Sequence, residues 1–371
     1  MKKFISILTL MICGIFLLVQ TKGFAQAKSP KVFIILGQLT GVSNGTPISL
    51  IDIDLLTIVE TVAVNDGKFT FKGEVKRPTS FWIKCMDEYA ILQVENTVIK
   101  FRASIKDMKL NYLAEGGNEQ ALQTQLNDAV RPFEKVYVPA YDSLVNKLYI
   151  DSAHQKKLTE QFNQYNAKYM RAYINFGKLH MNSYLGLDIV YRNRKVIPLD
   201  SILLLYNELS PMLKNTDIAN SLKIYTEEYI VKKGNKFLDF NVLDIEGKAF
   251  QLSALKEKYI YLTFGSFGCA PCRLENQYIA KNYARLSKIL HIVNFSMDTN
   301  ILEWRKAAKA DGIIWYNVSD MAGMAGKIKT LYDVQAMPTS FLIDKNGMIV
   351  ERFDGYDESN FSRIAKLITS N

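Results

Sequence analysis

Cys269-Ala270-Pro271-Cys272 is the stretch of the chain that most restricts its fold and chemistry. It lies between an apolar run at residues 259–264, which predicts a buried strand, and a helix-like segment at residues 273–290. Two cysteines separated by two residues at the start of a helix can share a disulfide or act as a reactive dithiol. Met337-Pro338-Thr339 follows later, directly before a second strand-like run at residues 341–344. Together, the two motifs predict thiol–disulfide exchange chemistry.

The residues around these motifs, 233–371, alternate between strand and helix patterns, which is typical of an α/β sheet. An opening hairpin is expected over residues 240–252. Asn346-Gly347 is a preferred hairpin turn, so the strands on either side of it are expected to pair. Asp357 is expected to cap a final helix at residues 359–368. One further strand and one further helix are expected at residues 292–295 and 301–310.

The helix start predicts different roles for the two cysteines. Free backbone N–H groups and the helix dipole stabilise an anion there, by about 0.3–1 kcal/mol at an exposed end. Cys269 is therefore expected to be the attacking thiol, and Cys272, one turn deeper, the resolving thiol. Pro271 stiffens the dipeptide between them. We expect the two sulfurs to lie within bonding distance of each other at the protein surface.

Two charged residues follow on the same predicted helix. Glu275 is three residues past Cys272 and so shares its helix face, where it could accept the proton of Cys272. On spacing alone, Glu275 could equally be a solvated acid. Arg273 is expected to be solvated.

Other uses of two close cysteines agree less well with the sequence. A structural zinc site needs four ligands, and His154, His180 and His291 are scattered. Covalent haem attachment needs a histidine after the second cysteine, where Arg273 stands. A purely structural disulfide in so short a loop would stabilise the protein little. We therefore expect no metal site and no cofactor.

The N-terminus predicts export. Met1-Lys2-Lys3 is positively charged, residues 4–19 are apolar, and Ala25-Gln26-Ala27 resembles a cleavage site, so residues 1–27 are predicted to be a signal peptide. The alternative is an N-terminal membrane anchor. With the signal peptide cleaved, no stable membrane insertion is expected.

Charge and the remaining cysteines add further limits. Removing residues 1–27 takes away three lysines, and the formal net charge falls from +9 to +6. The remaining charge is dispersed, so no nucleic-acid partner is expected. Cys13 leaves with the signal peptide. Cys85 is expected to be a small buried apolar residue, the alternative being a free or intermolecular thiol.

Two further segments precede the α/β part. Residues 28–116 contain short alternating runs, such as Phe69-Thr70-Phe71, separated by turn signals, and predict a β-sandwich. Residues 117–232 carry apolar residues at helical spacing and predict a helical connector. A tyrosine stripe at residues 165–173 is expected to pack against a neighbouring helix. Asp200 is expected to be a helix N-cap.

Residues from about 236 to the end resemble the TlpA/ResA-like extracytoplasmic thioredoxins of the AhpC/TSA–thioredoxin superfamily. The matching positions run from Phe264 through Cys269, Cys272-Arg273-x-Glu275 and Ser296-Met297-Asp298 to Trp304, Asp311-Gly312, Trp315, Ser319-Asp320, Tyr332-Asp333-Val334 and the segment 338–344. The resemblance implies a thioredoxin-like α/β fold. Residues 31–116 also resemble a β-rich domain of unknown function that precedes such thioredoxins in Gram-negative envelopes.

The resemblance implies roles by position. Cys269 and Cys272 match the attacking and resolving thiols, Glu275 the active-site glutamate, and Pro338 a cis-proline whose preceding residue, Met337, offers its backbone to a substrate peptide. Gly268, Ala270 and Pro271 would complete the substrate-binding rim. The buried acid of ordinary thioredoxins would fall at Thr263, so the proton-accepting role passes to Glu275. The family usually has tryptophan at the positions of Gly265 and Gly268, which leaves partner choice and redox potential open.

The sequence thus predicts an exported oxidoreductase of the periplasm or cell envelope. By family analogy it would reduce disulfides in cysteine-containing envelope proteins, with a membrane electron donor restoring its dithiol. One alternative is a non-catalytic envelope binding protein with a vestigial thioredoxin domain. Another is a peroxide-reducing enzyme on the same fold, although Leu262 stands where that family has proline.

Overall fold

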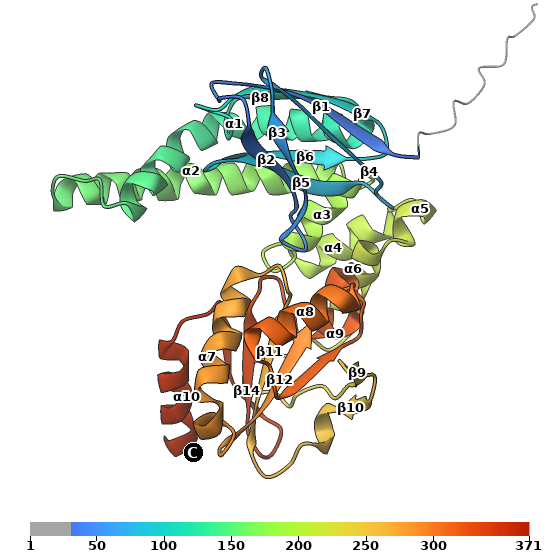
Figure 1. The fold of residues 1–371 in the computed structure, drawn as a ribbon, viewed down its shortest axis with the longest axis vertical. Helices are drawn as coiled ribbons and strands as arrows, with labels where there is room; N and C mark the ends of the chain where they lie inside the picture. Colours follow the sequence, from blue (N-terminus) through green and yellow to red (C-terminus); the bar gives the residue numbers. More distant parts are fainter. Residues whose placement is uncertain (1–30, 371) are drawn as a thin grey trace, which may run out of the picture.

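The computed structural model describes residues 31–370, so the predicted signal peptide lies outside the described residues. Figure 1 shows a β-sandwich, a helical part and an α/β domain in chain order. This is the predicted architecture, and the prediction is confirmed. Within residues 31–370, no helix combines the length and the apolar character that crossing a membrane requires.

The N-terminal sandwich consists of two four-stranded sheets with strand orders β4-β1-β7-β8 and β3-β2-β5-β6. β1 pairs in parallel with β7, and the other pairs are antiparallel. Side chains alternate as predicted, with Phe69 and Phe71 buried and Thr70 exposed. Cys85 is a free thiol buried in the core between the sheets, as predicted. The strands are β1 Phe33–Thr40, β2 Thr46–Asp52, β3 Thr57–Val64, β4 Lys68–Gly73, β5 Thr79–Cys85, β6 Glu88–Val94, β7 Val98–Ser104 and β8 Tyr112–Glu115.

The helical part begins with a hairpin of two long helices, α1 and α2. Helix α1 packs against strands β6 and β8 of the sandwich. The tyrosine stripe of α2 packs across the hairpin, with the rings of Tyr169 and Tyr137 5.2 Å apart, which confirms the predicted packing. Asp200 is not the N-cap of its helix, because α4 begins one residue earlier and Pro198 holds that position. The helices are α1 Asn118–Val145, α2 Ser152–Leu179, α3 Tyr184–Arg192, α4 Leu199–Asn207, α5 Pro211–Lys214 and α6 Asp217–Glu227.

The C-terminal domain is built on a seven-stranded mixed sheet with strand order β10-β9-β13-β12-β11-β14-β15. β11, β12 and β13 run parallel, and β14 runs antiparallel to β11. The hairpin predicted around Asn346-Gly347 joins β14 to β15. The strands are β9 Asn241–Asp244, β10 Ala249–Gln251, β11 Tyr259–Gly265, β12 Leu290–Ser296, β13 Tyr316–Ser319, β14 Thr339–Ile343 and β15 Ile349–Asp354, and the α-helices are α7 Ala270–Leu286, α8 Ile301–Asp311, α9 Lys327–Leu331 and α10 Ser359–Ser370.

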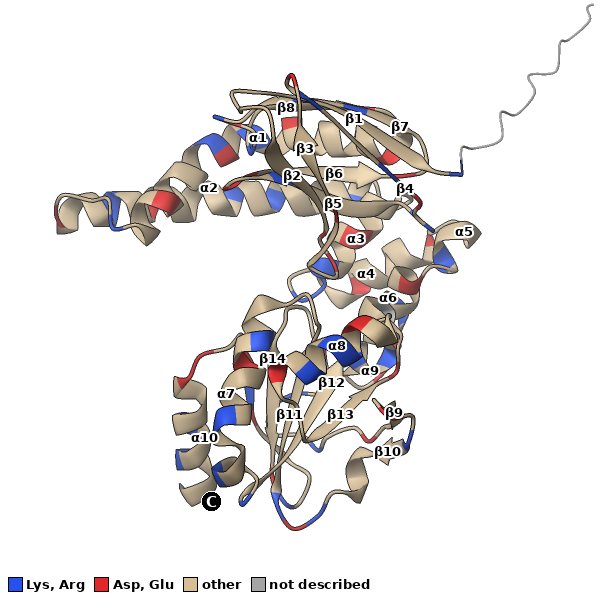
Figure 2. Cartoon of the chain, viewed as in Figure 1, with Lys and Arg blue, Asp and Glu red and all other residues tan. Residues whose placement is uncertain are grey.

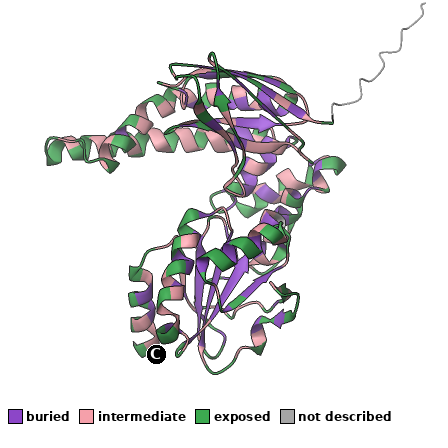
Figure 3. Ribbon diagram, viewed as in Figure 1, coloured by how far each residue is buried: buried purple, intermediate pink, exposed green. Residues whose placement is uncertain are grey.

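The centre of this sheet is buried on both faces, as Figure 3 shows for the strands of the domain. Every residue of β11 is buried, as expected for a central strand of an α/β sheet. Ile279 of α7 and Phe361 of α10 belong to the core on one face. Phe240 and Tyr332 belong to the core on the other face. α7, which carries the two cysteines in its first turn, is therefore fixed on a rigid sheet.

The helical part is joined to the α/β domain by buried charged contacts. The side chain of Arg194, which follows α3, is 1% exposed and donates to Asp333 at 2.5 Å. Lys195 reaches the same carboxylate at 2.6 Å, and Lys329 of α9 donates to the hydroxyl of Tyr191 at 3.0 Å. Figure 2 shows that Lys and Arg are interspersed with Asp and Glu through all three parts of the fold.

Candidate active site

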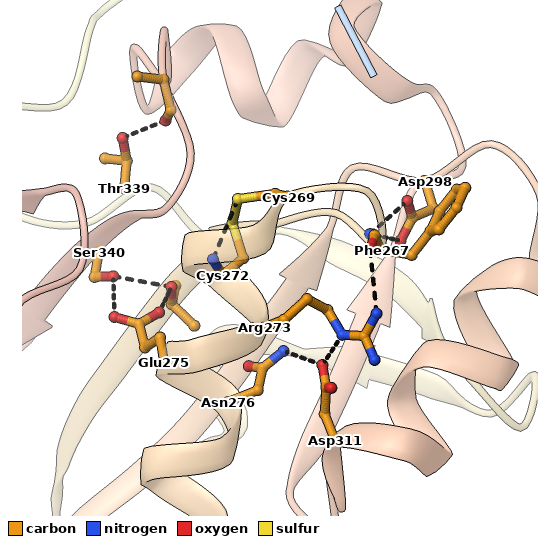
Figure 4. Close-up of a disulfide and its surroundings, with 12 residues drawn as sticks. Phe267, Cys269, Cys272, Arg273, Glu275, Asn276, Asp298, Asp311, Thr339 and Ser340 are labelled. Carbon is orange, nitrogen blue, oxygen red and sulfur yellow. Dashed lines mark hydrogen bonds and ion pairs between the residues drawn. A yellow bond between two sulfur atoms is a disulfide. The ribbon is translucent and has the colours of Figure 1, made fainter. Parts of the chain in front are cut away.

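The Cys-Ala-Pro-Cys motif lies at the carboxyl end of β11, in the first turn of α7. Cys269 is the N-cap of the helix, and its Sγ atom accepts a hydrogen bond from the N–H of Cys272 at 3.2 Å. Pro271 occupies the first turn, where its missing N–H costs no helical hydrogen bond. The two cysteines form a disulfide with an S–S distance of 2.03 Å (Figure 4). The predicted strand–motif–helix arrangement is therefore present.

The sulfur atoms do not lie at the surface, and this part of the prediction is wrong. Cys269 is 0% exposed and Cys272 is 4% exposed. Ala270 and Pro271, between them, are exposed, whereas Gly268 is half-buried. The prediction considered only the C-terminal domain. A turn of the N-terminal sandwich lies against Gly268, with Leu55 and Thr57 at the contact.

Pro338 lies at the same edge of the sheet as the disulfide. The peptide bond between Met337 and Pro338 is cis, as the resemblance implied. Thr339, the first residue of β14, pairs with Phe264 near the end of β11, which places Pro338 beside the loop that leads to Cys269. The carbonyl of Pro338 accepts from the N–H of Gly355 at 2.8 Å. Among residues 31–370, no hydrogen-bond partner engages Met337.

Glu275 is buried, at 1% exposure, one turn of α7 beyond Cys272. Its carboxylate accepts hydrogen bonds from the hydroxyls of Tyr261 at 2.6 Å and Thr263 at 2.7 Å. It also accepts from the hydroxyl of Ser340 at 3.4 Å (Figure 4). Burial raises the pKa of Glu275, and the hydroxyl donors lower it in part. The interpretation of Glu275 as a solvated acid is therefore wrong.

Arg273 is not solvated either, contrary to expectation. Its guanidinium forms an ion pair with the buried carboxylate of Asp311 at the end of α8, and it donates to the carbonyl of Phe267 at 3.4 Å. Asn276 donates to the same carboxylate at 3.2 Å. These contacts fasten the start of α7 to α8. Arg273 and Asp311 are 38 positions apart, and no local pattern in the sequence indicates that they pair.

Asp298 is a further residue of the site to which sequence reasoning assigned no role. Asp298 is 3% exposed, and its carboxylate accepts from the N–H of Phe267 at 3.0 Å and from the hydroxyl of Ser296 at 2.6 Å. Burial raises the pKa of Asp298. Asp298 thus fixes the loop that precedes Cys269. The position of Asp298 just after β12 could have indicated this role. The carboxyl ends of the parallel strands β11 and β12 meet at one edge of the sheet, so a residue that follows β12 lies near the motif that follows β11.

Replacing Asp298 by alanine is expected to lower the free energy of unfolding by about 1–3 kcal/mol, because the Phe267 N–H and the Ser296 hydroxyl lose their acceptor. Urea unfolding followed by tryptophan fluorescence measures the change. Asp298→Asn keeps one acceptor oxygen and should lose less than Asp298→Ala. Equal losses in the two variants would contradict the role of the hydrogen bonds.

The two glycines next to the motif are close to its sulfur atoms and to the sandwich. A Cβ atom on Gly265 would lie 3.2 Å from Cβ and 3.3 Å from Sγ of Cys272. A Cβ atom on Gly268 would lie 2.7 Å from the carbonyl oxygen of Leu55. Within residues 31–370, no group of three or more His, Cys, Asp or Glu side chains is arranged to hold a metal ion.

Comparison with known proteins agrees with this geometry. Residues 233–352 match the AhpC/TSA family, and residues 33–123 match a domain of unknown function, DUF4369. The thiol-disulfide oxidoreductase ResA of Bacillus thuringiensis subsp. konkukian is 31% identical over 132 residues, which cover 35% of this chain and 75% of the relative. The chain belongs to the ResA family of thiol-disulfide oxidoreductases.

A second member of the ResA family and a solved structure each match a little more than a third of the chain. ResA of Bacillus subtilis is 28% identical over 133 residues, or 36% of this chain and 73% of that protein. The solved thioredoxin domain of a thiol-disulfide oxidoreductase from Bacteroides vulgatus is 24% identical, covers 37% of this chain and 99% of its own, and has a TM-score of 0.35. The AhpC/TSA match falls on the C-terminal domain, and the sandwich matches the separate DUF4369 family.

Proposed function

We propose that this protein is an exported enzyme that reduces disulfides in envelope proteins through Cys269 and Cys272. The observation that carries the proposal is the disulfide in the first turn of α7, where the N–H of Cys272 points at Sγ of Cys269. In the reduced protein this N–H and the helix dipole would stabilise a thiolate on Cys269. A thiolate is the reactive form in disulfide exchange.

The reaction proceeds in two exchanges. The Cys269 thiolate attacks one sulfur of a partner's disulfide, forms a mixed disulfide and releases one partner thiolate. The Cys272 thiol passes its proton to the Glu275 carboxylate and attacks Sγ of Cys269, which forms the observed disulfide and releases the second partner thiolate. Two electrons have then passed to the partner. A dithiol on a membrane electron donor returns them in two reverse exchanges.

The edge of the sheet beside the disulfide is suited to hold the partner's chain. The N–H and C=O of Met337 have no hydrogen-bond partner among residues 31–370, and they precede the buried Pro338. An extended peptide could pair with this backbone, as strands add to an exposed edge. The exposed Ala270 and Pro271, with Gly268, would form the opposite rim.

We place the protein in the periplasm or cell envelope because residues 1–27 are predicted to be a signal peptide. A pair of cysteines that forms a disulfide also agrees with a compartment outside the cytoplasm, where disulfides persist. The sulfur chemistry of the two exchanges needs no cofactor.

A Cys272→Ser variant is expected to hold its partners as mixed disulfides through Cys269, because the resolving thiol is absent. Expression in the natural host, acid quenching, and mass spectrometry of the trapped species identify the partners. A Cys269→Ser/Cys272→Ser double variant is the matched control and should trap nothing. If the single variant traps no more than the double variant, the proposal of exchange with envelope proteins is wrong.

A non-catalytic binding protein is the second candidate, and the complete burial of Cys269 favours it. Insulin-reduction turnover separates the two candidates. An oxidoreductase should reduce insulin faster with the native chain than with Cys269→Ser, whereas a binding protein should give the same background rate with both.

A further inference from the structure

A turn of the N-terminal sandwich lies directly against the candidate active site. The turn joins β2 to β3 and comprises residues 52–57; Figure 1 shows these two strands extending from the sandwich toward the rest of the chain. A Cβ atom on Gly268 would lie 2.7 Å from the carbonyl oxygen of Leu55, 2.7 Å from Cγ2 of Thr57 and 2.8 Å from the carbonyl oxygen of Leu56. The main chain of the turn therefore contacts the residue before Cys269, and only glycine fits between them.

This contact explains why glycine is required at position 268. The space that a larger side chain would fill is taken by the turn, which comes from a different domain and from a position more than 200 residues earlier in the chain. Cys269, the next residue, is 0% exposed.

The turn is fixed in shape by its own sequence. One carboxylate oxygen of Asp52 accepts from the N–H of Asp54 at 2.8 Å and from the N–H of Leu55 at 2.9 Å. The N–H of Ile53 donates to the carbonyl of Ser80 on the neighbouring strand at 3.2 Å. Such aspartate-stabilised turns hold their backbone without help from the surroundings. The turn is thus held by hydrogen bonds within the sandwich as well as by its contact with Gly268.

A second contact clamps the turn from the helical part. Asp54 forms an ion pair with Arg192 at the end of α3, and Arg192 also donates to Asp188 at 2.6 Å. Asp188 is the largest factor that raises the pKa of Arg192, and Asp54 adds to it, so Arg192 stays charged. The turn is therefore held on one side by the helices and on the other by the loop of the active site.

We propose that residues 52–57 form a cap over the Cys269–Cys272 disulfide and determine which partners reach it. In the closed state shown by the structure, Sγ of Cys269 is closed to reagents, and exchange requires the cap to move off Gly268. Partner proteins with a disulfide on a thin, extended segment would enter with little displacement of the cap, whereas bulky folded surfaces would be excluded. This inference rests on the proposed exchange function and adds to it a structural basis for the choice of partner.

Access to the disulfide can be measured without any protein substrate. Tris(2-carboxyethyl)phosphine attacks one sulfur, which breaks the S–S bond and releases the other sulfur as a thiolate. Water then converts the phosphonium sulfur adduct into phosphine oxide and the second thiol, and the released proton protonates the first thiolate. The phosphine loses two electrons, and the disulfide gains two electrons and two protons. The rate of appearance of the two thiols, read by alkylation and intact mass, reports how often the cap is open.

Two variants of the full chain open the cap by different means. Asp54→Ala removes the clamp, and we expect reduction to accelerate about fivefold, since a partly exposed ion pair is lost. Gly268→Val places methyl groups against the main chain of the turn and should accelerate reduction about 100-fold or more, because the closed state is then excluded by steric overlap. The matched control is Asp87→Ala, which removes an exposed acid from the β5–β6 turn of the same sandwich and should leave the rate unchanged.

A dithiol peptide used in place of the phosphine should gain more from each cap variant, because a larger reagent needs a wider opening. The reduction potential of the Cys269–Cys272 disulfide, measured in glutathione buffers, should differ too little between the variants and the native protein to explain the faster reduction. If both folded variants are reduced within twofold of the native rate, the cap does not control access and the inference is overturned. If Gly268→Val does not fold, Asp54→Ala decides alone. If the cap variants are reduced faster by the phosphine but the protein does not reduce insulin, the proposed exchange function is wrong and the inference about the cap still holds.

Discussion

Glu275→Gln is expected to slow the resolving step by about 100-fold or more and to leave the first attack by Cys269 unchanged, because general-base assistance contributes about 10²–10⁴ to a rate. Glu275 is buried on the same helix face as Cys272 and holds three hydroxyl donors. Glutamine has nearly the same shape and can keep hydrogen bonds to these hydroxyls, whose protons rotate. It cannot accept the proton of Cys272 at neutral pH.

The two steps can be separated with an aromatic disulfide, 5,5′-dithiobis(2-nitrobenzoate). Attack by Cys269 releases the first coloured thiolate in a second-order phase. Attack by Cys272 on Sγ of Cys269 releases the second in a first-order phase that does not depend on reagent concentration. Stopped-flow absorbance should show that only the second phase is slow in Glu275→Gln. The log of that slow rate should rise by about one per pH unit, since hydroxide then removes the proton.

The matched control is Gln277→Ala on the exposed surface of the same helix, which should leave both phases unchanged. Equal slowing of both phases in Glu275→Gln would mean that the carboxylate only supports the shape of the site.

The same substitution, Glu275→Gln, is expected to slow the resolving step but to stabilise the folded protein. Burial raises the pKa of Glu275 above its ordinary value of 4.5, so the folded protein keeps this proton at pH values where the unfolded chain has lost it. The stability that the protonated form provides is complete below pH 4.5 and is lost as the pH rises through the folded-state pKa. Glu275→Gln should therefore melt at a higher temperature than the native protein at pH 7, with a smaller difference at pH 4.

Asp333→Ala is expected to destabilise the C-terminal domain by about 3–5 kcal/mol, because it leaves a buried guanidinium without its counter-charge. Asp333 follows α9 and pairs with Arg194, whose side chain is 1% exposed. Arg194 also stacks on the ring of Tyr191 at 4.3 Å, so it cannot reach water without breaking the contact between helices and domain. Differential scanning calorimetry should show the domain melting earlier.

Lys195→Ala is the matched control, because Lys195 pairs with the same carboxylate but its side chain is 45% exposed. Its loss should cost about 0–1 kcal/mol. An Arg194→Met/Asp333→Ala double variant should recover most of the stability, since both buried charges are removed. A large loss in Lys195→Ala, or none in Asp333→Ala, would contradict this account of the contact.

The local parts of the site could be predicted from the sequence. The apolar run before Cys269 defines β11, and the segment after Cys272 defines α7, because helix and strand signals are properties of neighbouring residues. The pairing of β14 with β11 then brings Pro338 to the motif. The tyrosine stripe of α2 and the burial of Cys85 were predicted for the same reason, since residue type and spacing decide them.

The parts that depend on distant segments could not be predicted. Nothing in residues 52–57 indicates that they lie on Gly268, because docking between domains depends on the relative placement of whole sheets. Arg273 was predicted to be solvated for the same reason, since its partner Asp311 lies on another helix. For Gly268, the resemblance indicates only a departure from the family pattern. The physical reason for the glycine is the main chain of the sandwich turn, which belongs to another domain.

The free cysteine in the sandwich core has a practical consequence. Cys85 is 1% exposed, and burial raises the pKa of its thiol, so it is both hidden from reagents and protonated at neutral pH. In the native protein it should be silent in thiol titrations. Counting sulfhydryl groups before and after denaturation therefore provides an internal calibration for the chain that lacks residues 1–27 and so lacks Cys13. The folded oxidised protein should give zero groups and the denatured protein one, and any excess reveals molecules in which the Cys269–Cys272 disulfide is reduced.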